Sequence, residues 1–368
     1  MSGSLQQLSA RLTSRFPWTS APLIVAAPMR VLAGPRLAVA VSAAGGFGFI
    51  GPAAKTKAMK DDLEEARQLI KESVELRDKL SDIAASSSPS NLPIGVGFQL
   101  WSDDLATAAQ LVQQYRPSVA WLYAPRDEQK DYALWSSTLR RASPDIAIWI
   151  QIGTVAEAEL LSKLAQVPDA IVVQGAEAGG HGRAHDGLGL LALLPEVAQV
   201  LQQNGHENIP LIAAGGIVNG RGAAAALCLG ATGVAIGTRF LAATEARISR
   251  GYQQEIVRAR DGGANTTRTV LYNQLRGTVG WPEQYAPRTI INRSYVDHVN
   301  GVPFDTLQKL HDEVVVRGDQ AWGPEGRVAT YAGASVGLIH DVRPAASLVR
   351  DIQRDTVRVL QSLQGGKL

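Results

Sequence analysis

The chain has 368 residues, of which 45% are hydrophobic and 19% charged, so it can bury a large core and is not disordered. Its 36 Lys and Arg residues against 34 Asp and Glu leave a net charge of +2, which gives no support for a nucleic-acid-binding protein. Cys228 is the single cysteine, which excludes an internal disulfide and a cysteine-based zinc site. It lies in a helical stretch of small apolar residues, and we expect it to be buried.

The sequence shows neither a membrane-spanning segment nor a secretory signal. No apolar run approaches the ~20 residues of a membrane span, and the N-terminus lacks the apolar core of a signal peptide. We therefore expect a cytoplasmic protein with no membrane partner. The last three residues, Gly366-Lys367-Leu368, resemble the peroxisomal Ser-Lys-Leu ending, with glycine in place of serine, and a polar tail without an address is the alternative.

Short apolar segments predict strands that are buried on both faces, as in a parallel sheet. There are eight: Pro22–Pro28, Gly46–Ile50, Ile94–Phe98, Val119–Tyr123, Ile146–Ile152, Ala170–Val173, Leu211–Ala214 and Gly233–Ile236. Helical patterns lie between them, and the alternation predicts an α/β fold, a (β/α)₈ barrel of the TIM type.

The first long helical pattern runs over Asp61–Leu80, with an apolar stripe from Leu63 to Leu80 and a charged opposite face. The segment Ser86–Asn91 predicts a flexible loop before the third strand. Further helical patterns lie at Asp103–Gln114, Val155–Ala165, Leu190–Gln202 and Arg221–Leu229.

The periodicity breaks after the eighth strand. Residues 258–330 are rich in Gly, Asn, Arg and aromatic residues, which indicates a small inserted subdomain rather than barrel. Pro344 opens a C-terminal helix with one apolar stripe. We predict a barrel over 1–250, an inserted subdomain or lid over 251–333, and a C-terminal helix over 334–368 that packs on the barrel.

Three short motifs carry little weight. Gly46, Gly48 and Gly51 match G-x-G-x-x-G but interleave with strand residues, so we interpret them as allowing close packing and not as a dinucleotide site. The Gly333–Gly337 segment matches the G-x-S-x-G nucleophile motif, but only His340 follows it, and we interpret the match as accidental. His181 and His185 stand four apart in a glycine-rich stretch, so we predict no metal site there.

Two glycine-bearing turns directly follow predicted strands seven and eight. They are Ala213–Ile217 and Ala235–Phe240. Barrel enzymes commonly bind a phosphate group between these two turns, because glycines let main-chain N–H groups approach its oxygens. Thr238 offers a hydroxyl donor. Tight strand-to-helix turns without a ligand are the alternative.

A third glycine-rich segment, Gln174–His181, follows strand six and places a histidine at the same end of the barrel. We expect this segment to be a loop without a packing role. Histidine serves as a general base near neutral pH, and a structural histidine is the alternative interpretation.

Together these segments resemble the nitronate monooxygenase family, formerly called 2-nitropropane dioxygenases. The resemblance runs from about Pro22 to Ala243 and continues through Asp261–Thr269 and His340–Ala345. It is carried, in order, by Ala26-Ala-Pro-Met29, Gly45–Gly51, Gln174–His181, Ala213–Ile217 and Gly230–Phe240.

The resemblance implies an FMN-dependent enzyme that oxidises alkyl nitronates, and nitroalkanes as a further substrate class, with O₂ to carbonyl compounds and nitrite. His181 would be the catalytic base. The residues that would contact FMN are Ala27, Met29, Gln174, Gly179, Gly180, Gly215, Gly216, Ala235, Ile236, Gly237 and Thr238.

The chain departs from the family at Gly97, where many relatives carry an asparagine, and Gln99 or Trp101 would shape that space instead. An NAD(P)H:quinone reductase and a biosynthetic flavin oxidase on the same barrel stay open as alternatives, as does a non-catalytic flavin-binding protein. The oligomeric state stays open.

Overall fold

The computed structural model describes residues 2–84 and 91–365, and within them eight parallel strands form one sheet. The sheet order is β1-β9-β8-β6-β5-β4-β3-β2, and a bridge between Val25 and Phe47 joins its two edges into a barrel. Each predicted strand is confirmed. The bounds are β1 Leu23–Ala26, β2 Phe49–Ile50, β3 Leu92–Gln99, β4 Pro117–Tyr123, β5 Ala147–Ile152, β6 Ala170–Gln174, β8 Leu211–Ala214 and β9 Gly233–Ile236.

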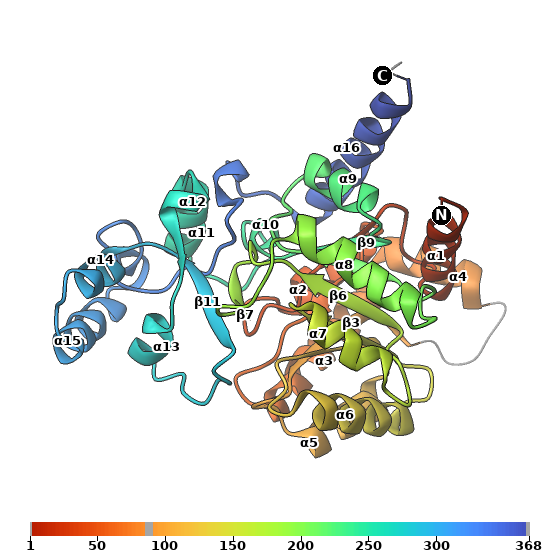
Figure 1. Ribbon diagram of the computed structural model, residues 1–368, viewed down its shortest axis with the longest axis horizontal. Helices are drawn as coiled ribbons and strands as arrows, with labels where there is room; N and C mark the ends of the chain where they lie inside the picture. The colour runs from red at the N-terminus through yellow and green to blue at the C-terminus, as the bar shows by residue number, and fades with distance from the viewer. Residues whose placement is uncertain (1, 85–90, 366–368) are drawn as a thin grey trace.

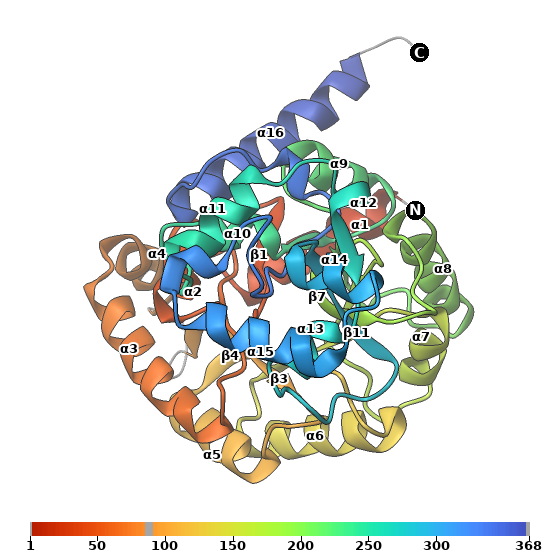
Figure 2. The ribbon, with the colours of Figure 1, turned by 90° about the vertical axis from the view of Figure 1, so that its left-hand side faces the viewer.

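Helices surround the strands as an outer ring (Figures 1 and 2). Capping residues in the sequence determine where such helices begin. Thr154 and Glu157, for example, form a reciprocal capping box at the start of α7. The ring comprises α2 Pro35–Ala43, α3 Met59–Glu72, α4 Val74–Ala84, α5 Leu105–Tyr115, α6 Glu128–Ala142, α7 Val155–Ser162, α8 Leu190–Gln203 and α9 Gly220–Cys228.

The prediction of one continuous helix over Asp61–Leu80 is wrong. The segment forms two helices, because α3 ends before Ser73 and α4 begins after it. Ser73 has extended backbone, and its hydroxyl accepts a hydrogen bond from the N–H of Leu76, which starts the second helix. The loop predicted at 86–91 lies outside the described residues except for Asn91, as do the terminal residues 366–368.

The N-terminal helix α1, Ser2–Arg15, and the residues after it cover the end of the barrel where the strands begin. Phe16 packs edge-on against Phe47, with ring centroids 4.8 Å apart, and also contacts Trp149. The glycines of the second strand allow close packing, as predicted: a Cβ on Gly48 would lie 1.8 Å from the Ala38 carbonyl oxygen.

Most of the segment after the barrel lies over the opposite end, where the strands finish (Figures 1 and 2). It contributes two strands of a three-stranded antiparallel sheet in the order β10-β11-β7. The third strand, β7, is Gly180–Arg183 from the segment after β6, so the loop predicted there is in part a strand. The elements of this region are α10 Thr238–Leu241, α11 Arg250–Arg258, α12 Gly262–Asn265, β10 Thr266–Arg268, α13 Leu271–Leu275, β11 Tyr285–Ile290, α14 Arg293–Val299 and α15 Phe304–Val315, with 3₁₀ turns at Gly318–Ala321 and Val336–Leu338. A further 3₁₀ turn, Thr56–Ala58, precedes α3 in the barrel.

The C-terminal helix α16, Ala345–Gly365, packs along α9 and extends past the barrel (Figure 1). A Cβ on Gly220 would lie 2.6 Å from the Thr356 nitrogen, so glycine permits this close approach. The expectation that Cys228 is buried is wrong: it is exposed, because α9 buries Ala223, Ala224 and Ala226 and turns its last residue outward. None of the described helices has the length and apolar character required to cross a membrane.

Candidate active site

A cavity of about 420 Å³ lies at the carboxyl ends of the strands, within the size range of small-molecule sites. Its walls come from the residues that follow β1, β6, β8 and β9 and from the segment after the barrel. Every residue predicted from the sequence as a site residue lines this cavity except Ile236, which is fully buried and accepts a hydrogen bond from the Ala27 N–H.

The turn after β8 requires glycine. Gly215 and Gly216 have φ angles of +99° and +71°, which side chains rarely adopt. A Cβ on Gly215 would also lie 2.9 Å from the Gly175 carbonyl oxygen. Because neither residue has a side chain, this turn exposes main-chain atoms directly at the cavity surface.

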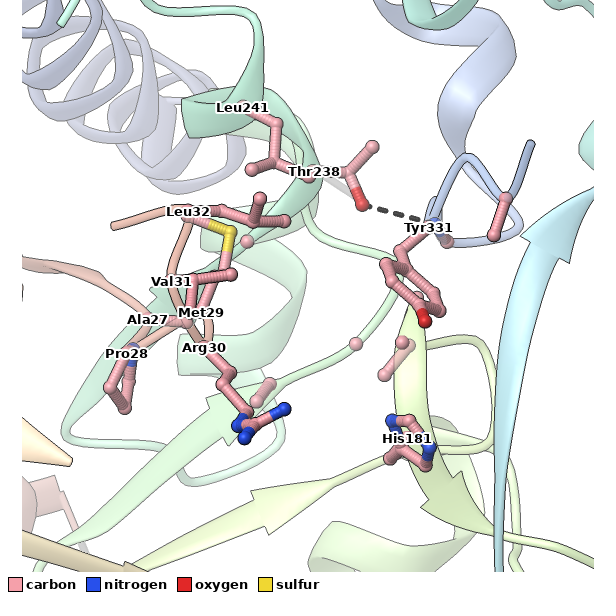
Figure 3. A pocket seen from close by; sticks show the side chains of 18 of the residues that line it. Ala27, Pro28, Met29, Arg30, Val31, Leu32, His181, Thr238, Leu241 and Tyr331 are labelled. Carbon is pink, nitrogen blue, oxygen red and sulfur yellow. Dashed lines mark hydrogen bonds between the residues drawn. The ribbon is translucent and has the colours of Figure 1, made fainter. Parts of the chain in front are cut away.

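The turn after β9 differs, because Gly237 has ordinary backbone angles and space beside it. A Cβ there would have Met29 Sδ as its nearest neighbour, at 3.7 Å. Thr238 follows, and its hydroxyl oxygen accepts a 3.0 Å hydrogen bond from the Gly333 N–H, which leaves its own proton to donate (Figure 3).

The segment Gly333–Ser335 forms a further wall that the sequence reasoning missed. Gly179 packs against it so closely that a Cβ would lie 2.4 Å from the Ala332 carbonyl carbon, and the Ala334 N–H donates to the Glu177 carbonyl oxygen. Ser335 lines the cavity near Gly216. The G-x-S-x-G match thus lies in the cavity wall, on a 3₁₀ turn and not on a strand-to-helix elbow.

The main chain of His181 is fixed by its neighbours. It lies in β7, opposite Pro287 of β11. Its carbonyl oxygen accepts hydrogen bonds from the Tyr123 hydroxyl at 2.8 Å and from the Gln174 amide at 3.3 Å. These contacts hold the residue at the cavity edge.

The imidazole ring of His181 is fixed by the segment after the barrel. It stacks on Trp281 with ring centroids 3.6 Å apart and planes 5° from parallel. Its Nε2 lies 3.1 Å from Asn273 Oδ1. Because an amide oxygen only accepts, Nε2 carries the proton and Nδ1 keeps the lone pair. The sequence alone offered no signal for Asn273.

These surroundings lower the pKa of His181 to about 3. Burial is the largest cause, since a charged imidazolium is poorly solvated there, and the hydrogen bond to Asn273 opposes it. The positive charges of Arg268, Arg276 and Arg30 lower the pKa further. His181 is therefore neutral at every physiological pH.

Replacing Asn273 by aspartate tests this assignment. A buried carboxylate beside Nε2 stabilises the imidazolium, so we expect the pKa of His181 to rise towards neutrality. Any reaction in which the neutral ring accepts a proton should then lose rate as the pH falls through this higher pKa, whereas the wild type keeps its rate down to about pH 3. The measurement is the pH profile of kcat/KM for a neutral nitroalkane. Superimposable profiles would mean that Asn273 does not govern the ring.

Two arginines hold the main chain behind His181. Arg268 donates to the carbonyl oxygens of Gly180, Ala178 and Ala176, at 3.1, 3.0 and 3.2 Å. Arg288, its cross-strand neighbour, also donates to Ala176. The segment that carries the predicted cavity glycines is thus tied to the sheet of the inserted region.

The space around Gly97 explains its departure from the family pattern. A Cβ there would lie 2.5 Å from Pro28 Cβ, so asparagine at this position requires either Pro28 or the strand to shift. Gln99, two residues on, lines the same cavity, and its side-chain oxygen is buried without a hydrogen-bond partner among the described residues. A buried acceptor of this kind calls for a donor from a ligand or water.

We expect Gly97→Asn to destabilise the fold by about 1–3 kcal/mol, the usual cost of overpacking. Thermal unfolding measures it, with Gly263→Asn as the comparison, because the backbone there does not require glycine and a Cβ would have Asp261 Oδ1 as its nearest neighbour, at 3.5 Å. A melting temperature equal to that of the wild type would show that Pro28 yields.

Within the described residues, no group of three His, Cys, Asp or Glu side chains is placed to hold a metal ion. The barrel, with a ligand-sized cavity at the carboxyl ends of its strands and a buried histidine in the wall, has the arrangement of a (β/α)₈-barrel enzyme.

Comparison with known proteins specifies the family. The family model described as nitronate monooxygenase matches residues 18–355. The nitronate monooxygenase npaC of Metarhizium robertsii is 54% identical over 352 residues, 96% of each chain, and a nitronate monooxygenase of Neurospora crassa is 34% identical over 98% of this chain and 96% of its own. The chain belongs to the nitronate monooxygenase family and is an oxidoreductase.

Solved structures support the fold. The nitroalkane oxidase of Streptomyces ansochromogenes superposes with a TM-score of 0.70 at 22% identity, over 96% of this chain and 99% of its own. FabK from Thermotoga maritima superposes with a TM-score of 0.68 at 25% identity, over 96% and 98%. At these identities the likeness concerns the barrel and its inserted region.

Proposed function

We propose that this chain is an FMN-dependent enzyme that oxidises alkyl nitronates with O₂ to carbonyl compounds and nitrite. One observation carries the proposal: the glycine turns after β8 and β9 and the ring of His181 line the same cavity. Membership of the nitronate monooxygenase family supports the choice of substrate.

The residues present fit a flavin mononucleotide. No Asp or Glu lines the cavity along the described residues, so a phosphate meets no like charge there. The turn at Gly215 and Gly216 and the turn at Gly237 and Thr238 would hold the phosphate, and Ser335 adds a hydroxyl. Gln174 and the unpartnered oxygen of Gln99 supply polar groups for the ring system.

When bound, the flavin supplies the redox chemistry, and the protein orients the substrate and moves the proton. Nδ1 of His181 is free to accept the α-proton of a neutral nitroalkane. A base with a pKa of about 3 is a weak acceptor for such a proton. Nitronates have already lost it, so the site supports nitronates as the better substrates.

The inserted region completes the site, which supports our division of the chain into a barrel over 1–250, a lid over 251–333 and a C-terminal helix over 334–368. Asn273, Trp281 and Tyr331 all come from this lid and surround His181. The rings of Trp281 and Tyr331 help to bury the imidazole away from bulk water. A cytoplasmic location is part of the proposal, since a lone exposed thiol suits a reducing compartment.

The test is turnover of propyl nitronate in air, followed by nitrite formation and oxygen uptake. We expect both, in step with aldehyde formation. The purified protein is then mixed with NADH without oxygen: no bleaching of the flavin agrees with the proposal, whereas rapid bleaching together with absent nitrite would favour a quinone reductase.

A further inference from the structure

Two arginines line the cavity and form no salt bridge along the described residues, although the carboxylate of Asp103 lies close enough to Arg30 to interact with its charge. Arg30 donates to the Ala54 carbonyl oxygen at 3.2 Å, and Arg276 donates to the Tyr331 hydroxyl at 2.5 Å. Neither forms a salt bridge with an acid among the residues that the structure describes. Arg247 at the same cavity differs, because Asp62 pairs with it at 2.7 Å.

The charges of both Arg30 and Arg276 act on His181. Arg30 comes from the residues after β1, and its guanidinium points into the space that the His181 ring and the Tyr331 hydroxyl also face (Figure 3). Arg276 follows α13 in the lid and reaches the cavity beside Tyr331, whose ring lies 6.1 Å from that of His181. Two cations thus approach one space from opposite sides, barrel and lid.

The chemistry of this space selects an anion with a flat pair of oxygens. A guanidinium presents parallel N–H donors that match two oxygens on one atom, as in a carboxylate or a nitro group. The Tyr331 hydroxyl accepts its hydrogen bond from Arg276, so its own proton remains to be donated. No Asp or Glu among the described residues lines the cavity, so no carboxylate there competes with an anionic ligand for these donors.

We propose that Arg30 and the pair Arg276–Tyr331 bind the two oxygens of the substrate's nitro group and so determine its orientation towards His181. This inference rests on the proposed function for the identity of the substrate. It assigns binding of the two nitro-group oxygens to residues outside the five sequence motifs, two of which, Arg276 and Tyr331, come from the lid.

The test measures nitronate kinetics in Arg30→Met and Arg276→Met, with Arg141→Met, an exposed arginine on α6, as the matched control. Loss of a charge-assisted hydrogen bond should raise KM for propyl nitronate about tenfold to a hundredfold in each cavity variant. The effect on kcat should be smaller, and KM for neutral nitroethane should change less. Arg141→Met should match the wild type.

A second readout separates this inference from the proposed function. Nitrate is a flat anion that undergoes no turnover, and calorimetric titration measures its binding to the protein as purified. We expect binding that weakens at least tenfold in Arg30→Met and Arg276→Met, even if the wild type oxidises no nitronate. Failure of the wild type to bind nitrate, or unchanged KM and nitrate affinity in both variants, would overturn the proposal.

Discussion

Replacement of His181 by asparagine is expected to slow turnover of a neutral nitroalkane by roughly 10²–10⁴-fold, the usual worth of a general base. Nitronate turnover should fall much less, because a nitronate has no α-proton left to remove. Asparagine keeps the main-chain partners of His181, which are Pro287, Tyr123 and Gln174. Steady-state kcat/KM for nitroethane and for ethyl nitronate gives the comparison directly.

The flavin content of the His181→Asn variant serves as its control, since an intact cofactor site is needed to read the kinetics. Losses of equal size on both substrates would refute the base assignment and leave His181 a positioning role. The stack on Trp281 makes that outcome a real alternative, because removal of the ring also removes this contact.

The second large effect concerns the phosphate. Gly237→Asp should yield protein without flavin, since a carboxylate at this turn faces the phosphate and repels it. The position suits the test because a Cβ there has 3.7 Å of clearance and the backbone is unstrained. Gly237→Ala is the matched control, and it should retain its flavin. The ratio of flavin to protein absorbance in the purified variants measures the outcome.

Gly216→Asp should lose flavin too, but its φ of +71° adds backbone strain and makes it the less specific probe. Full flavin occupancy in Gly237→Asp would place the phosphate elsewhere. Equal loss in the aspartate and alanine variants would point to an effect of shape and not of charge.

The barrel could be predicted because its strands are buried on both faces and so form continuous apolar runs. The positions of the two glycine turns after β8 and β9 could be predicted because glycine is costly inside regular structure and its clusters mark the strand ends. The break at Ser73 was missed, since the apolar stripe continues across it. The prediction that Cys228 is buried was wrong, because in a helix made mostly of alanine the buried and exposed faces have nearly the same hydrophobicity.

The side chains that contact His181 could not be predicted from the sequence. Asn273 is 92 residues from His181 along the chain, and Trp281 lies in a segment without periodicity. Their contacts arise only when β7 joins the sheet of the lid. The consequence of Gly97 likewise depends on Pro28, a neighbour from another strand end.

We propose that the turns after β8 and β9 hold the phosphate of a flavin beside His181. An absorbance spectrum of the purified protein, together with the mass of the cofactor that acid releases, tests this arrangement. We expect a flavin spectrum and FMN at one molecule per chain. A colourless protein that cannot be reconstituted with added FMN would contradict it.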